Sequence, residues 1–408
     1  MRPEPRPAGD AAPPGGSRRR LAMVIHSQYP NVHVRREALA LLERGWAVEV
    51  FCLRGGSDRP EDVVEGVVVH RLPVRRRKGA GASSQLLEYA AFFAFAAARL
   101  TARHLRRRFD VVQVHNLPDF LVFAAAVPKL LGTPILLDLH DLMPEFYMSR
   151  FGRGPDSPAV RLVRLQERLA CAFADRVITV TELWRRALVE RGVPAAKVGV
   201  VMNLPDEATF VRPTRMPERA DERFRLIYHG TFAHRYGIDV AIRAVARLRD
   251  ELPVELIVHG VGEALPELRR LASELDVTDR VRFSTTLVPA VELPSLLVQA
   301  DAGVVPYRRD VFTDGILPTK LLEYVALGIP AIVSRTPVVE QYFDDSMVRF
   351  VEPGDVEDLA AAIRELAGDP ARRAALASAA ARFGERHNWR RQSAEYAELV
   401  AGLADRRR

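Results

Sequence analysis

The sequence predicts an α/β protein with two domains, each built on a mostly parallel β-sheet. Short apolar stretches, typical of buried strands, alternate with longer stretches that repeat apolar residues at helical spacing. A length of 408 residues is enough for two domains that each bury a core of their own. A proline-rich segment at residues 203–221 interrupts the alternation near the middle, so we expect it to link the domains.

The first half of the chain holds the strands and helices of the first domain, which we place at residues 21–204. We expect strands at residues 22–26, 48–53, 67–72, 111–115, 135–140, 177–181 and 198–202. We expect helices at residues 34–44, 85–108, 120–131, 159–174 and 183–191. Residues 1–20 are rich in proline, glycine, alanine and arginine, so we expect a disordered tail there.

The second half repeats the alternation in a second domain, which we place at residues 205–385. We expect strands at residues 226–229, 254–259, 281–283, 303–305 and 331–333, with helices between them. Residues 359–386 are expected to be largely helical, and a last helix is expected around residues 389–403.

One stretch of the second domain, residues 306–334, combines helix signals with charged side chains. Pro318 fits a first helical turn, where a missing N–H costs no hydrogen bond, and Gly328 fits a helix end. Lys320 and Glu323 then lie in the first turns, beside free backbone N–H groups and the positive end of the helix dipole. Such a place suits an anionic ligand, and the carboxylate can accept hydrogen bonds from sugar hydroxyls. A capped surface helix with ordinary charges is the alternative.

Within that stretch, residues 317–330 (LPTKLLEYVALGIP) resemble the donor-site segment of family 4 glycosyltransferases. These enzymes have the GT-B fold, in which two Rossmann-like domains face each other across a cleft. The resemblance covers residues 21–385 and implies that a C-terminal helix at residues 386–408 crosses back to the first domain. It also implies that Glu323 binds the donor ribose and that the preceding loop meets phosphate and sugar. The loop residues concerned are Asp314, Gly315, Ile316 and Leu317, and Gly315 stands where the family often has a second glutamate.

Ligands of open parallel sheets bind at the carboxyl ends of the strands, so the residues there are candidates for binding. The first strand is followed by Asn31 and Arg35, which can meet an acceptor or the donor phosphate, or can simply cap and solvate the next helix. This turn lacks the Gly-x-Gly-x-x-Gly pattern of dinucleotide-binding folds, which disfavours an NAD-dependent enzyme. The fourth strand ends before Asn116, another candidate contact of the acceptor.

Residues 137–146 (LDLHDLMPEF) end a buried strand in a dense cluster of polar groups. Such groups are costly to bury unless they form hydrogen bonds or ion pairs, or take part in binding or catalysis. The segment resembles the family's His-Asp … Pro-Glu element, which implies that His140 lines the reaction centre, with Asp141 beside it as the second catalytic candidate. A hydrogen bond to the donor sugar is the expected role of His140, and Glu145 is an expected acceptor contact. A satisfied structural histidine is the alternative.

The first turns of the second domain offer small residues and an arginine for a diphosphate. A glycine after the strand lets the backbone approach a ligand, and Arg235 can bind a diphosphate through two hydrogen bonds. Relatives usually have a lysine directly before the helix glycine, where this chain has Tyr236. A Gly-x-Gly pair ends the next strand; such glycines mostly serve tight turns, but the pair recurs in the family. The donor-binding residues expected here are His229, Gly230, Thr231, Arg235, Gly260 and Gly262.

The net charge of +7 is unevenly distributed along the chain. Residues 71–108 hold ten basic residues against one acid, Glu88, and surround an apolar helix candidate. The span is either a core helix with a solvated basic end or a contact for an anionic membrane surface. No helix-turn-helix, zinc-finger or RNA-recognition signature accompanies the charge, so we do not expect a nucleic-acid partner.

Cofactor and compartment signals are sparse. Cys52 and Cys171 are the only cysteines, too few for a disulfide framework, so a reducing cytoplasm is expected. No apolar run reaches the roughly 18–20 residues that cross a bilayer, so we expect at most a peripheral position at the inner face of a membrane. Because no Asp-x-Asp pair and no Cys/His zinc spacing occur, neither a metal nor another cofactor is expected.

Together these features predict a metal-independent, retaining GT-B glycosyltransferase of family 4. Its expected substrates are a nucleoside diphosphate sugar and a glycan or lipid-linked acceptor. A nucleotide-sugar epimerase or hydrolase of the same fold, and a non-enzymatic basic membrane-binding protein, are the alternatives.

Overall fold

The computed structural model of the protein describes residues 18–56, 58–74, 82–214, 221–286 and 288–406. The predicted disordered tail lies outside the described residues up to residue 17, and so do the basic residues 75–78 and part of the expected linker, residues 215–220.

The chain packs as two compact units. Unit 1 comprises Met1–Leu139, Leu169–Val177 and Ser393–Arg408, and unit 2 comprises His140–Arg168 and Ile178–Gln392. This division by packing differs from the domain limits expected from the sequence, which stay a prediction.

The first sheet has eight strands in the order β3-β4-β2-β1-β5-β6-β7-β8. Its strands are β1 (Arg20–Val24), β2 (Ala47–Leu53), β3 (Glu61–Val64), β4 (Val67–Leu72), β5 (Val111–His115), β6 (Ile135–Leu139), β7 (Arg176–Thr179) and β8 (Val198–Val200). The pairs β1–β2, β1–β5, β2–β4 and β5–β6 are parallel, whereas β3 pairs with β4 in the antiparallel direction. Strands β1, β2 and β5 are almost wholly buried, as expected for parallel strands covered on both faces.

The second sheet has six strands in the order β11-β10-β9-β12-β13-β14, with parallel pairing throughout. Its strands are β9 (Phe224–Thr231), β10 (Val254–Val261), β11 (Val281–Ser284), β12 (Ala302–Val305), β13 (Ala331–Ser334) and β14 (Arg349–Val351). The strand order reverses between β9 and β12: β10 and β11 follow on one side of β9, and β12 to β14 lie on its other side. Such a switch point is where open α/β sheets bind their ligands.

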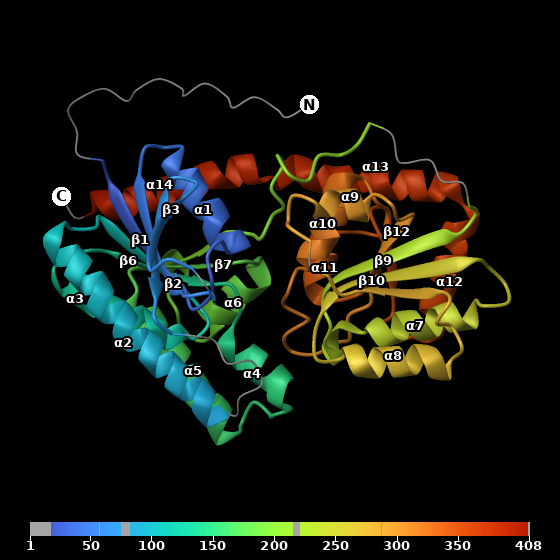
Figure 1. The fold of residues 1–408 in the computed structure, drawn as a ribbon, viewed down its shortest axis with the longest axis horizontal. Coiled ribbons are helices and arrows are strands. Elements are labelled where there is room, and N and C mark those ends of the chain that lie inside the picture. Colours follow the sequence, from blue (N-terminus) through green and yellow to red (C-terminus); the bar gives the residue numbers. More distant parts are fainter. Residues whose placement is uncertain (1–17, 57, 75–81, 215–220, 287, 407–408) are drawn as a thin grey trace. The chain divides into compact units, whose positions relative to one another are not determined.

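Helices connect the strands in both halves of the chain (Figure 1). Those of the first half are α1 (Val32–Leu42), α2 (Ala82–Arg106), the 3-10 helix η1 (Asp119–Ala125), α3 (Ala126–Leu130), α4 (Met143–Phe151), α5 (Pro158–Phe173), α6 (Glu182–Glu190) and η2 (Ala195–Lys197). Those of the second half are η3 (His234–Tyr236), α7 (Ile238–Arg247), α8 (Leu265–Glu274), α9 (Leu293–Leu297), α10 (Thr319–Leu327), α11 (Pro337–Tyr342), α12 (Val356–Gly368), α13 (Pro370–Arg386) and α14 (Trp389–Asp405).

The prediction of two parallel-sheet α/β domains is confirmed, and each expected strand begins and ends within two residues of its predicted limits. Among the described residues, the sequence did not predict the strands β3 and β14, the helices α4 and α11, or the 3-10 helices η2 and η3. Strand β3 is exposed or half-buried at an edge, so it carries no apolar run. Helix α4 begins with a proline in its first turn, inside the polar segment that the sequence presented as a candidate site.

The helices of unit 2 lie on both faces of its sheet. Helices α7 and α8 lie side by side along one face, and α10 lies on the other (Figure 1). The core between them is apolar and includes the buried Tyr324 of α10 and Ile242 of α7.

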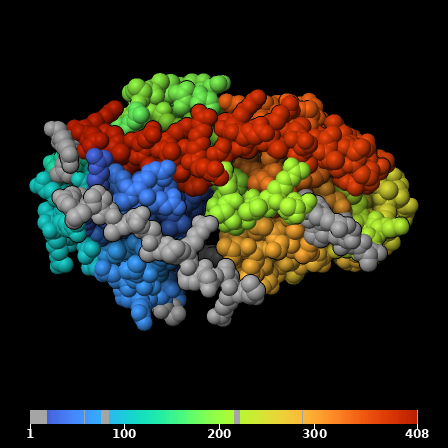
Figure 2. All heavy atoms as spheres, turned by 90° about the horizontal axis from the view of Figure 1, so that it is seen from above, coloured from blue at the N-terminus to red at the C-terminus, as the bar shows by residue number. Residues whose placement is uncertain are grey.

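The last helix begins in unit 2 and belongs to unit 1 from Ser393 onward. Its Tyr396 is buried in unit 1 and donates a hydrogen bond to Gln113 Oε1 of β5 at 2.5 Å. Helices α13 and α14 lie at the surface in the view of Figure 2.

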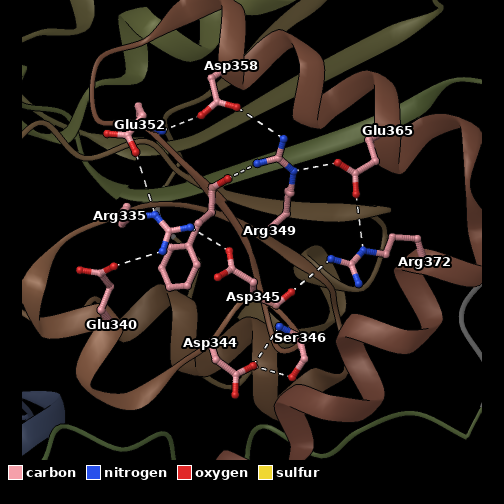
Figure 3. A network of polar contacts seen from close by, with 11 residues as sticks. Arg335, Glu340, Asp344, Asp345, Ser346, Arg349, Glu352, Asp358, Glu365 and Arg372 are labelled. Carbon is pink, nitrogen blue, oxygen red and sulfur yellow. Dashed lines mark hydrogen bonds and ion pairs between the residues drawn. The ribbon is translucent and has the colours of Figure 1, made fainter.

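A network of ion pairs joins β14 and its neighbouring helices in unit 2 (Figure 3). Arg335 pairs with Glu340 at 3.1 Å and with Asp345 at 2.8 Å, and Arg349 pairs with Glu365 at 2.8 Å. Because these side chains are at least one quarter exposed, we assign each pair only about 0–1 kcal/mol of stability.

Candidate functional site

Helix α10 forms as the sequence predicts and brings two charged residues to the carboxyl end of β9. Pro318 precedes the helix, and Gly328 ends it in the left-handed conformation, with φ 72°. Lys320 lies next to Gly230: its Nζ is 3.6 Å from the point where a Cβ on that glycine would stand. Glu323 reaches the strand through His229, whose Nε2 is 2.5 Å from Glu323 Oε2.

Lys320 is buried in a cage of tyrosines. The residue is only 6% exposed. Its Nζ donates a hydrogen bond to the Tyr307 hydroxyl at 2.5 Å. The same Nζ lies 5.0 Å from the centre of the Tyr228 ring and 5.3 Å from that of Tyr236. Loss of hydration lowers the pKa of Lys320 to about 8, against the opposing effect of Glu323. A buried ammonium without a full counter-charge is costly, and an anionic ligand at Gly230 would compensate it.

Close backbone packing requires the two glycines at the carboxyl end of β10. A Cβ on Gly260 would lie 1.9 Å from the Gly230 carbonyl oxygen, and one on Gly262 would lie 2.2 Å from the Phe232 carbonyl oxygen. Gly230 itself has φ 120° and faces only Lys320, so it keeps open space next to the ammonium. Packing therefore accounts for Gly260 and Gly262, while Thr231 is exposed at the end of β9.

Arg235 and Asp141 lie near each other in unit 2. The guanidinium of Arg235 lies over the rings of Phe146 and Phe312 at 5.7 and 5.6 Å and donates weakly to Ser149 Oγ at 3.5 Å. Burial raises the pKa of Asp141 to about 6, against the opposing effect of the Arg235 charge. His140 and Asp141 are half-buried and directly follow β6.

The loop before α10 explains why no glutamate stands at position 315. A Cβ on Gly315 would lie 1.7 Å from Trp184 Nε1, and the Gly315 carbonyl accepts a hydrogen bond from Thr181 Oγ1 at 3.2 Å. Asp314 forms a two-point ion pair with Arg309, at 2.6 and 2.9 Å. Ile316 is half-buried and Leu317 belongs to the core. The backbone N–H groups of residues 314–316 donate to carbonyls of the same loop, so the donor-binding roles expected of residues 314–317 stay predictions.

The two residues expected after the first strand have structural partners. Asn31 caps α1, where its side-chain oxygen accepts from the N–H groups of His33 at 3.2 Å and Val34 at 3.5 Å. Arg35 donates to the Glu65 carboxylate at 2.6 Å. Their acceptor-binding roles stay predictions, since capping and ion pairing account for both residues.

The other two expected acceptor contacts are also engaged. Asn116 donates to Asp119 Oδ1 at 3.0 Å. Glu145 pairs with Arg191, which also donates to the buried Glu167 at 2.7 Å. Their acceptor roles likewise stay predictions.

A buried polar network in unit 1 was missed by the sequence analysis. Gln113 donates to Glu37 at 2.7 Å and to Asp138 at 3.3 Å, and His115 Nδ1 lies 3.0 Å from Asp138. Burial, with the neighbouring Asp138 charge, holds the pKa of Glu37 well above its usual range. Nothing in the sequence indicates that Glu37, one glutamate on an amphipathic helix, is buried. The polar residues within the apolar strands β5 and β6 were the only signal that could have revealed the network.

The basic span around α2 is partly neutralised inside unit 1. Arg99 pairs with Glu61 at 2.8 Å and Arg103 with Glu49 at 3.0 Å. One face of α2 nevertheless carries exposed apolar side chains, among them Leu87 at 72% and Leu105 at 65% exposure. Among the described residues, no helix has the length and apolar character needed to cross a membrane.

Comparison with known proteins places these features in a family. Two family models match consecutive parts of the chain: a glycosyl transferase 4-like domain at residues 30–203 and a glycosyl transferases group 1 domain at residues 214–383. A D-inositol 3-phosphate glycosyltransferase of Geodermatophilus obscurus is 30% identical over 384 residues, covering 88% of this chain and 82% of that protein. The chain is a GT-B glycosyltransferase of family 4.

Solved structures agree with this family's fold. A sucrose-phosphate synthase from Thermosynechococcus elongatus superimposes with a TM-score of 0.76 at 20% identity, covering 95% of this chain and 99% of that chain. The Anabaena protein HepE, solved in complex with UDP-glucose, gives a TM-score of 0.70 at 15% identity, covering 94% of this chain and 99% of that chain. At these identities the likeness supports the fold of this glycosyltransferase and nothing finer.

Proposed function

We propose that this glycosyltransferase takes its sugar from a nucleoside diphosphate sugar that binds at the carboxyl end of β9 beside the start of α10. One observation carries the proposal: Lys320, Glu323 and the open backbone of Gly230 converge there. An ammonium, a helix N-terminus and an uncovered glycine suit a diphosphate, and a carboxylate suits a pair of ribose hydroxyls. The complex of HepE with UDP-glucose supports this donor class by analogy.

Each residue near β9 has a distinct proposed role. Lys320 and the first turn of α10 bind the diphosphate and stabilise the charge that develops as it leaves. Arg235 adds a second cation at the turn after β9. Glu323 binds the ribose. His140 donates a hydrogen bond to the donor sugar, as the family resemblance suggests.

Retention and metal independence belong to the same proposal. In the retaining course that we propose, the acceptor attacks the face from which the diphosphate departs, so no protein carboxylate needs to form a bond to the sugar. Lys320, Arg235 and the α10 N-terminus supply the positive charge that a metal ion would otherwise provide at the diphosphate. Activity is therefore expected to persist in a chelator.

The acceptor is proposed to be a glycan or a lipid-linked glycan at an anionic membrane surface. The exposed apolar side chains of α2 and the arginines at its carboxyl end support this part of the proposal. The name of the Geodermatophilus relative adds a phosphorylated cyclitol to the acceptors worth testing.

Turnover with a panel of donors and acceptors tests the proposal. The protein is incubated with UDP-, GDP- and ADP-sugars, together with membrane lipid extract or inositol 3-phosphate, with and without EDTA. We expect one nucleotide to be released only when an acceptor is present, and a product with the donor's anomeric configuration by NMR. Release without acceptor would indicate a hydrolase, inversion would overturn the retaining course, and loss of activity in EDTA would overturn metal independence.

A further inference from the structure

A chain of hydrogen bonds links the backbone of β9 to the carboxylate of Glu323. The Tyr324 hydroxyl lies 2.9 Å from the Ile227 carbonyl oxygen, and His229 Nδ1 lies 3.0 Å from the same hydroxyl. On the other side of the ring, His229 Nε2 lies 2.5 Å from Glu323 Oε2. All of these groups belong to β9 and α10, within unit 2.

The protons of this chain can be assigned because a carbonyl oxygen only accepts hydrogen bonds. The one phenolic proton of Tyr324 therefore goes to Ile227, and the Tyr324 oxygen accepts from His229. His229 thus carries a proton on Nδ1. Another proton must lie between Nε2 and Glu323. Without it, the lone pairs of the ring nitrogen and of the carboxylate oxygen would point at each other and repel.

Only one oxygen of Glu323 takes part in this arrangement. The other, Oε1, has no hydrogen-bond partner among the residues that the structure describes, and the side chain is 18% exposed, against 7% for His229. The buried oxygen is thus held by the protein, and the remaining oxygen is available to a ligand.

We propose that His229 is a positioning residue for ribose recognition, which fixes Glu323 in the orientation that accepts the ribose hydroxyls. The histidine acts through Glu323, while Tyr324 and the Ile227 carbonyl fix the histidine ring. This inference rests on the proposed function, in which Glu323 binds the donor ribose. The sequence predicted that His229 binds the donor directly, whereas the inferred role is indirect, through Glu323.

Other ionisable groups surround His229 and Glu323. A series of nucleotides with and without ribose hydroxyls therefore reports on these two residues more directly than a pH profile does. Lys320 of α10 and Tyr307 interact electrostatically with Glu323, and His259 of β10 interacts with His229, its partner in strand register. Each of these groups can titrate on its own, whereas loss of a ribose hydroxyl affects only the group that binds it.

Two substitutions at His229 separate its two hydrogen bonds. His229→Asn places an amide N–H near the position of Nδ1 and removes the donor to Glu323. His229→Gln places an amide N–H near the position of Nε2 and keeps that donor. UDP and GDP, each with its 2′-deoxy and 3′-deoxy form, are titrated calorimetrically into the wild type, both variants and Glu323→Ala.

The readout is the ratio of affinities for the ribonucleotide and its deoxy forms. We expect the wild type to prefer the ribonucleotide by about tenfold or more, as befits a charge-assisted hydrogen bond. His229→Asn should lower that ratio about as far as Glu323→Ala does, and His229→Gln should keep most of it. If His229→Asn does not fold, Tyr324→Phe, which removes the acceptor that orients Nδ1, should lower the ratio in part.

The outcomes distinguish failure of this inference from failure of the proposed function. If Glu323→Ala lowers the affinity ratio but His229→Asn and Tyr324→Phe leave it unchanged, the proposed role of His229 is wrong and the ribose site stands. An equal loss of affinity for ribo and deoxy forms in His229→Asn would also overturn it, because it indicates a purely structural role. No binding of either nucleotide to the wild type, or a ratio unaffected by Glu323→Ala, would remove the proposed ribose site as well.

Discussion

Replacing Lys320 by methionine is expected to stabilise the protein at neutral pH while weakening nucleotide binding. Burial lowers the pKa of this lysine from 10.5 to about 8. Because the unfolded chain then binds the proton more tightly than the folded protein, burying the charged lysine costs about 3 kcal/mol at pH 7. Loss of the hydrogen bond to Tyr307 offsets about 1 kcal/mol of the expected gain. We therefore expect Lys320→Met to be about 2 kcal/mol more stable than the wild type.

The same pKa shift predicts how this difference changes with pH. Below pH 8 both states keep the proton, so the cost is constant. Between about pH 8 and 10.5 the folded protein has lost the proton while the unfolded chain still holds it, so the cost shrinks as pH rises. From pH 7 to pH 9.5 the wild type should gain about 2 kcal/mol of stability relative to Lys320→Met.

Urea unfolding at pH 7 and pH 9.5 measures both effects, and calorimetric titration with UDP and GDP measures binding. Lys129→Met is the matched control, because it removes a lysine that pairs with Asp175 at 2.9 Å near the surface. This control should change stability by at most about 1 kcal/mol and leave nucleotide affinity unchanged. A Lys320→Met variant that is less stable than the wild type by the same amount at both pH values would refute the reasoning, since it would mean that the buried ammonium carries no desolvation cost.

Further predictions concern packing, buried charge and the exposed face of α2. Gly260→Ala should lower the free energy of unfolding by at least about 2 kcal/mol, measured with urea, because its Cβ would lie 1.9 Å from the Gly230 carbonyl oxygen. Gly368→Ala is the control and should not show this loss, because a Cβ there would meet no atom within 4 Å. The raised pKa of Glu37 means that stability falls as pH rises above its unfolded value of 4.5, so Glu37→Gln should gain on the wild type between pH 5 and pH 8. A variant that tracks the wild type across this range would contradict a buried, protonated Glu37. In flotation with anionic vesicles, Leu87→Ser should reduce recovery of the protein with lipid, and unchanged recovery would count against a membrane contact through α2.

The local signals of α10 were strong enough to predict it from the sequence. A proline before the first turn, apolar residues at helical spacing and a glycine at the end each act over a few residues. The strand-end rule also pointed to His229 and Gly230 as candidates, because it depends only on the alternation of strands and helices. The structure brings both residues to the first turns of this helix. The two parallel sheets followed from the same alternation.

Contacts between distant residues could not be predicted in this way. The pair of His229 and Glu323 joins positions 94 residues apart, and nothing local in the sequence distinguishes it from two separate ligands. The tyrosine cage around Lys320 draws on three different segments. The sequence therefore placed the lysine in the first turn of the helix but gave no sign that it is buried. The glycine at position 315 gave a clear anomaly, but its cause, the ring of Trp184, is visible only in the fold.

The most direct test of a nucleotide-sugar donor site at β9 and α10 is the affinity of UDP and GDP for the wild type and for Glu323→Ala, measured by calorimetry at pH 7. The wild type should bind one of the two nucleotides, and the variant should bind it about tenfold to a hundredfold more weakly while still unfolding in a cooperative thermal transition. Equal affinity in the two proteins would contradict the donor site proposed at the start of α10.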